Sequence, residues 1–349
     1  MPRSSVVAAL AALLLAACGA HITDATGDAP DGASAGSDSG EGDAGEESAT
    51  TSNVAPLIIE PDQGMQPIYN FIGTATKTLD MTMYEQTDTE VTTLLTQAAA
   101  RGVTVRVILD QNNEKTANTP SFTALSAGNV QVHWANPTYA CTHQKTITVD
   151  GKTSAIMTLN FAADEYKTSR DFAVITTDAA DVAAIETVFN ADFASASIIP
   201  TIGDNLVWSP TNAETALLGI ISGAKTSLLV ENEEMSDSAI VSALSSAASR
   251  GVTVQVVMED STSYTSEFTT LTTAGVKLAT YSHAAIYIHA KVILADYGMS
   301  SARAFVGSEN FSNASLTENR ELGLITTDPG ILTSLHTTLA SDFSGGTAY

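Results

Sequence analysis

The sequence predicts an α/β protein that contains two copies of one structural unit. Arg101–Val105 (RGVTV) recurs 149 residues later as Arg250–Val254, and Ile175–Asp178 (ITTD) recurs 150 residues later as Ile325–Asp328. In each copy an Ala- and Ser-rich stretch with helical spacing precedes a β-branched run. This alternation is typical of an α/β unit with a largely buried sheet. The repeat is too long for a solenoid.

The elements of each copy follow from apolar periodicity. The predicted strands are Leu79–Tyr84, Val103–Leu109, Ile147–Val149, Met157–Asn160 and Phe172–Thr176 in the first copy, and Leu228–Glu231, Val252–Met258, Val292–Ala295, Ala304–Val306 and Leu322–Thr326 in the second. Helices are predicted over Val91–Ala100, Ala180–Ala194, Ile240–Ser249 and Gly330–Phe343. Because apolar patterning lapses near Pro200–Asn205, we place the halves at residues 55–203 and 204–349.

The first 17 residues have the pattern of a secretory signal peptide. An early Arg3 precedes an apolar run, Val6–Ala17, that is too short to span a bilayer. Leu15–Cys18 resembles the lipobox of bacterial lipoproteins, which implies cleavage before Cys18 and acylation of its thiol. Since Gly19 carries no retention charge, an exported protein anchored in the outer membrane or on the cell surface is expected. The alternative is an ordinary signal peptide, with Cys18 incidental.

Residues 18–54 are predicted to be an acidic, disordered linker, because they contain acids and small residues but no Lys or Arg. The acidity continues beyond the linker, and the whole chain has a formal charge of −24. This charge excludes a broad basic face that grips nucleic acid and argues against adsorption to anionic lipid. A small basic pocket inside an acidic shell is compatible with this charge.

A metal or other cofactor is not expected. The two cysteines, Cys18 and Cys141, cannot form a disulfide framework or a Cys-rich zinc site. No His and carboxylate cluster in the sequence has the spacing of zinc ligands.

Two His-x-Lys pairs lie at matching places in the duplication. His143 and Lys145 are two residues apart, so on a strand they face the same side, and His289 and Lys291 repeat the arrangement. A single His-x-Lys pair is weak evidence for a site. Two copies, at equivalent positions in a Lys-poor chain, predict one shared site.

Asp150 and Asp296 each follow their Lys by five residues, which completes the His-x-Lys-x4-Asp signature of the phospholipase D superfamily. The chain resembles this family over essentially all of residues 55–345. The resemblance implies two α/β/α halves, each with a mixed β-sheet flanked by helices, related by a pseudo-twofold axis.

The family also expects a Gly-Ser-x-Asn stretch, which the second copy has as Gly307–Asn310. The first copy has Met157–Asn160, which keeps Asn160 and the hydroxyl of Thr158 but lacks the Gly. The stretch comes four residues later in the second copy, which implies a longer hairpin around Tyr297–Arg303.

The resemblance implies cleavage of a phosphodiester without a metal, through a phosphohistidine that water or an alcohol resolves. Positive charges and amide donors can neutralise the phosphate, one imidazole can attack phosphorus, and the other can protonate the leaving group. The implied roles are: His143, nucleophile; His289, acid/base; Lys145, Lys291, Asn160 and Asn310, phosphate binding; Asp171 and Glu321, orientation of a histidine; Thr158 and Ser308, support; Asp150 and Asp296, mostly structural.

Three classes of function remain at this point. A hydrolase of phospholipid head groups is favoured by the export signal, the lipid anchor and the acidic body, with phospholipid and the membrane as partners. A nucleic-acid phosphodiesterase, or a phosphatidyltransferase of cardiolipin synthase type, is the alternative enzyme, and a non-catalytic surface protein is the third. Glu231, Glu233 and Glu234 either face the cleft as a selectivity element or form a solvated strand end. Head-group preference and oligomeric state stay open.

Overall fold

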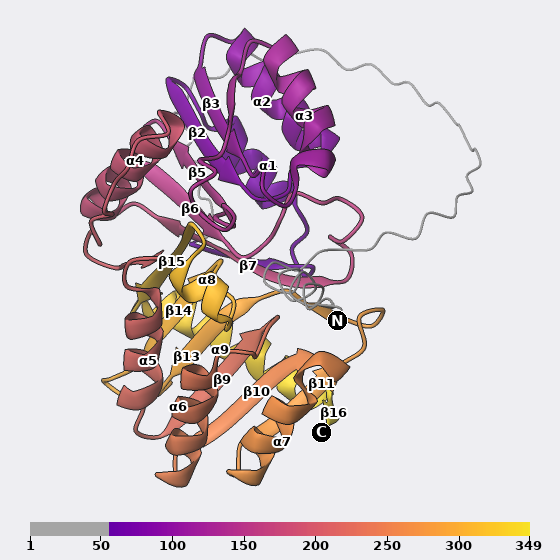
Figure 1. Ribbon diagram of the computed structural model, residues 1–349, viewed down its shortest axis with the longest axis vertical. Coiled ribbons are helices and arrows are strands. Elements are labelled where there is room, and N and C mark those ends of the chain that lie inside the picture. The colour runs from indigo at the N-terminus through magenta and orange to yellow at the C-terminus, as the bar shows by residue number, and fades with distance from the viewer. Residues whose placement is uncertain (1–55) are drawn as a thin grey trace, which may run out of the picture.

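The computed structural model describes residues 56–349, so the predicted signal peptide, the linker and Cys18 lie outside the described residues. Two α/β units lie one above the other, the first in indigo through magenta to rose and the second in rose-red through orange to yellow (Figure 1). Each unit contains one mixed sheet flanked by helices, which confirms the predicted fold class.

The two sheets have the same strand order apart from their edges. In the first sheet the order is β1-β7-β6-β5-β2-β3-β4, and in the second it is β16-β11-β10-β9-β13-β14-β15-β8. The three strands β2, β3 and β4 are parallel to one another, as are β9, β10 and β11, whereas the other neighbours in these two orders pair antiparallel. The short strand β12 lies outside these orders and joins β7 in parallel.

The strand bounds are β1 Leu57–Glu60, β2 Thr78–Met83, β3 Thr104–Leu109, β4 Gln131–Trp134, β5 Thr146–Val149, β6 Thr153–Met157, β7 Ser169–Thr176, β8 Leu206–Ser209, β9 Ser227–Asn232, β10 Thr253–Glu259, β11 Lys277–Tyr281, β12 Tyr287–Ile288, β13 Lys291–Ala295, β14 Arg303–Gly307, β15 Glu321–Thr326 and β16 Thr347–Ala348. The α-helices are α1 Gln66–Gly73, α2 Thr89–Ala100, α3 Lys115–Ala127, α4 Ala179–Phe193, α5 Ala213–Gly223, α6 Ser238–Ser249, α7 Thr265–Thr273, α8 Asn313–Thr317 and α9 Pro329–Gly345.

The repeated sequence motifs are the ends of helices. Asp178 and Asp328, the last residues of the two ITTD motifs, cap α4 and α9 by accepting two backbone N–H bonds each. A cap of this kind contributes about 1 kcal/mol. Gly102 and Gly251, in the two RGVTV motifs, follow α2 and α6 with φ of 93° and 91°, a conformation that glycine adopts without strain. These motifs recur because both halves need the same turns.

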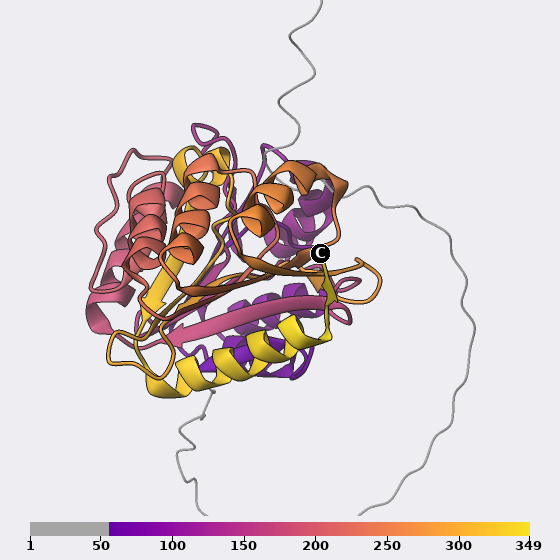
Figure 2. The same ribbon diagram turned by 90° about the horizontal axis from the view of Figure 1, so that it is seen from below.

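Three large apolar clusters and one small one form the core of the described residues. One lies between α1–α3 and the first sheet, and a second lies between α5–α7 and the second sheet. The third joins the inner faces of both sheets, where Ile156 and Phe172 belong to the same cluster as Val292 and Val306. Helices α4 and α9 also contact these inner faces (Figure 2). The two halves therefore share one interior.

Two buried ion pairs cross between the halves in a swapped arrangement. Arg170, at the start of β7, pairs with Asp342 of α9, with 2.7 Å between Nε and Oδ2. Arg320, just before β15, pairs with Asp192 of α4, with 2.9 Å between Nε and Oδ2. Because removing one partner of a buried pair leaves an uncompensated charge, these pairs favour one placement of the halves.

Two expectations about the strands near the site are wrong. The predicted strand Ile147–Val149 lies within β5, but β5 begins at Thr146, so His143 and Lys145 precede the strand, because the backbone N–H of His143 bonds instead to Arg320 of the other half, at 2.9 Å. β6 ends at Met157 rather than beginning there, because the following chain turns towards the loop after β2, where the N–H of Phe161 donates to Glu85 O. The predicted longer hairpin is confirmed, since residues 296–302 connect β13 to β14 whereas residues 150–152 connect β5 to β6.

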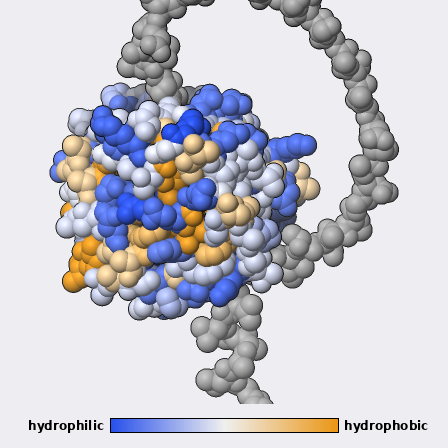
Figure 3. All heavy atoms as spheres, turned by 90° about the horizontal axis from the view of Figure 1, so that it is seen from above, coloured by the Kyte–Doolittle hydropathy of each residue, from blue (hydrophilic) through white to orange (hydrophobic). Residues whose placement is uncertain are grey.

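The surface is mixed in polarity. On the face in Figure 3, hydrophilic residues lie around a central band of apolar residues. In the part of the chain that the structure describes, the exposed large apolar side chains are Ile199, Ile202, Met299 and Tyr349. No helix within residues 56–349 is both long enough and apolar enough to cross a bilayer.

Candidate active site

Backbone pairing between the halves places each histidine beside a carboxylate of the other half. Ile288 of β12 pairs in parallel with Arg170, so the next residues, His289 and Asp171, become neighbours. Thr142 forms the equivalent bridge with Arg320, just before His143 and Glu321. Neither half therefore contains a complete site by itself.

The two contacts that result are nearly identical. His289 Nδ1 lies 2.9 Å from Asp171 Oδ1, and His143 Nδ1 lies 2.8 Å from Glu321 Oε2. Both imidazoles and both carboxylates are buried. Because Nδ1 faces acceptors, it carries a proton in each ring, which leaves Nε2 as the nitrogen available for chemistry.

Each carboxylate is held by hydroxyl or amide donors. Asp171 accepts from Thr158 Oγ1 and from Ser169 Oγ, both at 2.5 Å. Burial raises the pKa of the Asp171 carboxyl, but the charges of His289 and Lys291 hold that pKa below its ordinary value. Asp171 is therefore ionised at neutral pH and can fix the orientation of the His289 ring.

Glu321 is held by donors that local sequence reasoning missed. It accepts from Ser315 Oγ at 2.6 Å and from Asn319 Nδ2 at 3.0 Å. Burial opposes ionisation, but His143 and Lys145 hold the pKa of Glu321 below its ordinary value. No sequence signal marks Ser315 or Asn319, because neither belongs to the repeated motifs.

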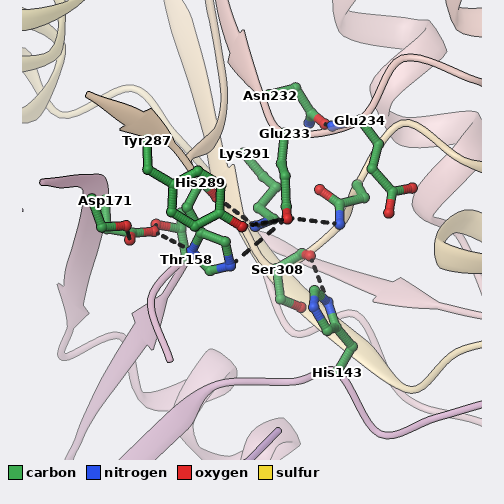
Figure 4. A network of polar contacts seen from close by, with 12 residues as sticks. His143, Thr158, Asp171, Asn232, Glu233, Glu234, Tyr287, His289, Lys291 and Ser308 are labelled. Carbon is green, nitrogen blue, oxygen red and sulfur yellow. Dashed lines mark hydrogen bonds and ion pairs between the residues drawn. The ribbon is translucent and has the colours of Figure 1, made fainter. Parts of the chain in front are cut away.

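The hydroxyls of Thr158 and Ser308 perform the same local task in the two halves. Thr158 Oγ1 accepts from the backbone N–H of Phe172 at 2.9 Å, and Ser308 Oγ accepts from the backbone N–H of Leu322 at 3.1 Å. In addition, the carbonyl oxygen of Ser308 lies 3.1 Å from His143 Nδ1 (Figure 4).

Two fully buried lysines supply positive charge. Lys145 Nζ donates to the carbonyl oxygen of His143 at 2.7 Å, and Lys291 Nζ donates to the carbonyl oxygen of His289. Burial and the charge of Lys291 lower the pKa of Lys145 to about 7. Burial also lowers the pKa of His143 below its ordinary value, against the opposing effect of Glu321.

The two lysines have different neighbours. Lys145 Nζ lies 4.9 Å from the centre of the Tyr84 ring, and this ring packs edge-on against His143 with 4.6 Å between ring centres. Lys291 Nζ instead donates to Glu233 Oε2 at 2.8 Å. Tyr84 follows β2 and Glu233 follows β9 at equivalent positions.

The three glutamates that end the opening strand of the second copy are not a solvated strand end. Glu231 and Glu234 are buried, and the Glu233 side chain is 15% exposed. Within the contacts that the structure describes, Glu233 is the one of these three glutamates that bonds to both Lys291 and Asn310.

Asn310 contacts Glu233, and Asn160 lines a small cavity together with Asp171. Asn310 Nδ2 donates to Glu233 Oε2 at 3.2 Å, and its backbone N–H donates to Ser315 Oγ at 2.7 Å. Asn160 is buried in the equivalent stretch of the first half, and within the described part of the chain its Oδ1 has no hydrogen-bond partner.

Asp150 and Asp296 lie away from the histidines, at the far ends of β5 and β13. Asp296 accepts from the backbone N–H groups of Lys225, Thr226 and Ser227, and from Ser301 Oγ. Despite burial, these bonds lower the pKa of Asp296 to about 2. Asp150 accepts in the same way from Thr76, Lys77 and Thr78. Both side chains tie the turn before the opening strand to the His-bearing segment.

A metal-ligand cluster is absent from the described residues: no three or more His, Cys, Asp or Glu side chains within 56–349 are grouped to hold a metal ion.

The chain is similar to known proteins in both sequence and fold. The family model described as "Cardiolipin synthase, PLD-like domain" matches residues 68–193 and 217–343. No curated protein sequence gives a significant match.

Three solved structures illustrate the likeness. Phosphatidylserine synthase from Haemophilus influenzae Rd KW20 is 11% identical with a TM-score of 0.63, and the match covers 84% of this chain and 87% of that one. Polyphosphate kinase from Porphyromonas gingivalis is 16% identical with a TM-score of 0.62, over 82% of this chain. This chain thus spans about half of that kinase, since 50% of it is covered.

The third structure is the phospholipase D family member Nuc from Salmonella typhimurium, 27% identical with a TM-score of 0.38, covering 41% of this chain and 95% of that one. The family model accounts for most of both halves, including both His-x-Lys segments. The chain therefore belongs to the phospholipase D-like family of cardiolipin synthase type, and it contains two copies of the family domain.

Proposed function

We propose that this protein is a phosphodiesterase of phospholipase D type that hydrolyses the head-group phosphodiester of phospholipids through a phosphohistidine intermediate. One observation carries the proposal: two His, Lys and Asn sets from different halves meet in one site, and each histidine is fixed by a carboxylate of the other half.

In the first step His143 Nε2 attacks phosphorus, and the bond between phosphorus and the head-group oxygen breaks. His289 gives its Nε2 proton to that oxygen, which leaves as an alcohol. Lys145, Lys291 and the side-chain amides neutralise the charge on the non-bridging oxygens. In the second step water attacks phosphorus, His289 takes a proton from the water, and the bond from phosphorus to His143 breaks.

The assignment of the two histidines rests on their surroundings. Burial lowers the pKa of His143, which favours the neutral, nucleophilic imidazole at neutral pH. His289 lies between two carboxylates, with Asp171 at Nδ1 and Glu233 Oε2 3.7 Å from Nε2. Asp171 fixes the ring through Nδ1, so Nε2 of His289 faces the site, where it can pass a proton to the leaving group.

Lipid is favoured over nucleic acid because of charge. Residues 55–349 contain 31 acids and 14 Lys or Arg residues, so strands of phosphates would meet a predominantly acidic surface. A phospholipid presents a single phosphodiester, and the two lysines of the site can neutralise it.

The test compares two substrates under the same conditions. Purified protein is incubated in EDTA with defined phospholipid vesicles and, separately, with supercoiled plasmid. Head-group release that is absent in both His143→Ala and His289→Ala supports the proposal. Plasmid nicking with the same dependence on both histidines, without lipid cleavage, would assign a nuclease. Activity in neither assay would favour the non-catalytic alternative.

A transferase of cardiolipin synthase type is the second candidate, because the matching family model carries that description. Water and an alcohol compete for the same phosphohistidine, so both products can be measured together. Vesicles of phosphatidylglycerol would yield cardiolipin in a transferase and phosphatidic acid in a hydrolase.

We also propose that the protein is exported and lipid-anchored through Cys18. The support is the sequence alone, namely the apolar run that ends in Leu15-Ala16-Ala17-Cys18. Replacing Cys18 with Ser is expected to release the protein from the membrane fraction. A Cys18→Ser protein that remains there after a high-salt wash would contradict the anchor.

A further inference from the structure

A carboxylate of the chain occupies a position suited to the substrate's phosphate oxygens. Glu233 Oε2 lies 2.8 Å from Lys291 Nζ, 3.2 Å from Asn310 Nδ2 and 3.7 Å from His289 Nε2. These three groups, a cation, an amide donor and an imidazole nitrogen, are the second-half groups that the proposed function directs at the substrate. Figure 4 shows Glu233 beside Lys291 and His289.

This carboxylate is firmly held and stays charged. Its other oxygen, Oε1, accepts from the hydroxyl of Tyr287 at 2.7 Å, and Tyr287 is itself buried. Although burial raises the pKa of Glu233, Lys291 and His289 lower it well below its ordinary value. Glu233 therefore keeps its negative charge near neutral pH and stays paired with Lys291 in the absence of substrate.

The first half lacks this carboxylate. Its equivalent residue is Tyr84, whose uncharged ring lies beside Lys145. The positive charge of Lys145 is thus directly available to an anion, whereas that of Lys291 is already paired. The feature is specific to one half and does not follow from the shared fold.

We propose that Glu233 is a specificity-determining residue, a resident carboxylate that the substrate phosphate must displace from Lys291 and Asn310. After displacement Glu233 stays tethered beside the ligand, so it repels the ligand in proportion to the ligand's charge. The site then selects phosphodiesters, which carry one negative charge, against phosphomonoesters, which carry two.

The consequence for turnover rests on the proposed function. Head-group hydrolysis converts a phosphodiester into a phosphomonoester, so the same repulsion would weaken the binding of the lipid product. Glu233 would thereby favour product release.

The test measures binding of two small probes to the full chain at pH 7 by titration calorimetry. Dimethyl phosphate is a monoanion, and methyl phosphate is mostly a dianion because its second pKa is about 6. We expect Glu233→Gln to bind methyl phosphate at least about ten-fold more tightly than the parent protein and dimethyl phosphate with a smaller gain.

Glu234→Gln is the matched control. Glu234 is the neighbouring residue and is also buried, but burial raises its pKa to about 8, so at pH 7 the substitution removes little charge. We expect it to leave both affinities unchanged. Glu233→Ala serves as a second charge-removing variant, and thermal unfolding verifies that each variant is folded.

Three results would overturn the proposal: unchanged or weaker binding of both probes in the Glu233 variants, equal gains for both probes, or the same gain in Glu234→Gln. None of these measurements involves lipid turnover. A protein that fails to cleave phospholipid can still show the selective gain, so the two proposals fail separately.

Discussion

In the first half Lys145 lies beside the Tyr84 ring, whereas in the second half Lys291 lies beside the Glu233 carboxylate. The histidines differ far less, since each bonds through Nδ1 to a carboxylate of the other half. The duplication has therefore kept the parts that orient the imidazoles and has diverged in the parts that set the charge around them. Divergence of this kind allows two similar histidines to take different roles.

The missing glycine of the first motif has a structural explanation. In the second half Gly307 pairs with Gly323, and a Cβ on either would collide with the buried side chains of Phe305 and Glu309. In the first half Met157 pairs with Ala173, and the residues equivalent to Phe305 and Glu309 are Ala155 and Leu159. The glycines make room for a phenylalanine ring and a buried glutamate that the first half lacks, so its departure from the motif does not imply a lost site.

The largest expected effects come from the histidines, and they would show how far the roles differ. We expect His143→Ala and His289→Ala each to reduce kcat by more than about 10⁴-fold, since loss of acid–base help alone costs about 10²–10⁴-fold. A substrate with a p-nitrophenolate leaving group needs no proton for departure. With it, rapid-quench assays should detect a first-turnover burst in His289→Ala but not in His143→Ala. The opposite pattern would reverse the assignment.

Removal of the orienting carboxylates is expected to have the next largest effect. Asp171→Asn and Glu321→Gln should each reduce kcat by about 10²–10⁴-fold while KM changes little, because an amide no longer fixes the tautomer of the facing imidazole. Steady-state kinetics on a soluble phosphodiester would measure this. If only one of the two variants lost activity, the equivalence of the two orienting contacts would be wrong.

We expect the pH dependence of anion binding to arise from Lys145 in the first half. Lys145, with its pKa lowered to about 7, is charged below that pH and loses its proton above it. We therefore expect dimethyl phosphate to bind more weakly as the pH rises from 6 to 8, approaching about ten-fold per pH unit above the pKa. Calorimetry on Lys145→Arg is the control, because a guanidinium stays charged throughout. An identical pH profile in that variant would assign the titration to another group.

The smallest effects concern stability at the two signature aspartates. Asp296→Ala should lower the free energy of unfolding by about 1–3 kcal/mol, because the backbone N–H groups of Lys225, Thr226 and Ser227 lose their acceptor. The folded-state pKa of Asp296 is lowered, so its stabilisation is present above the unfolded-state pKa and is lost as the pH falls towards about 2. Chemical denaturation at pH 7 and pH 3 would measure this, with Asp150→Ala as the matched variant. If kcat in either variant fell by more than the loss of folded protein accounts for, a purely structural role of that aspartate would be contradicted.

The duplication, the central strands of both sheets, four of the nine α-helices in the described residues and the two His-Lys pairs could be predicted from sequence, because each leaves a local pattern. The ITTD and RGVTV motifs are the helix caps and turns that both halves need, so their recurrence marked the repeat directly. The extra residues between Asp296 and Arg303 likewise predicted the longer hairpin, because hairpin length is counted along the chain.

The tertiary structure decided that the carboxylate beside each histidine comes from the other half. His143 and Glu321 are 178 residues apart, and they meet because Thr142 bridges to Arg320 across the two sheets. Glu233 and Lys291 are 58 residues apart, and the sequence left open whether Glu233 faced the site or solvent. Local periodicity reports which way a side chain faces from its own element. Burial, the lowered pKa of Lys145 and the carboxylate beside Lys291 depend on what the other elements bring to that point, and the packing of both halves sets them.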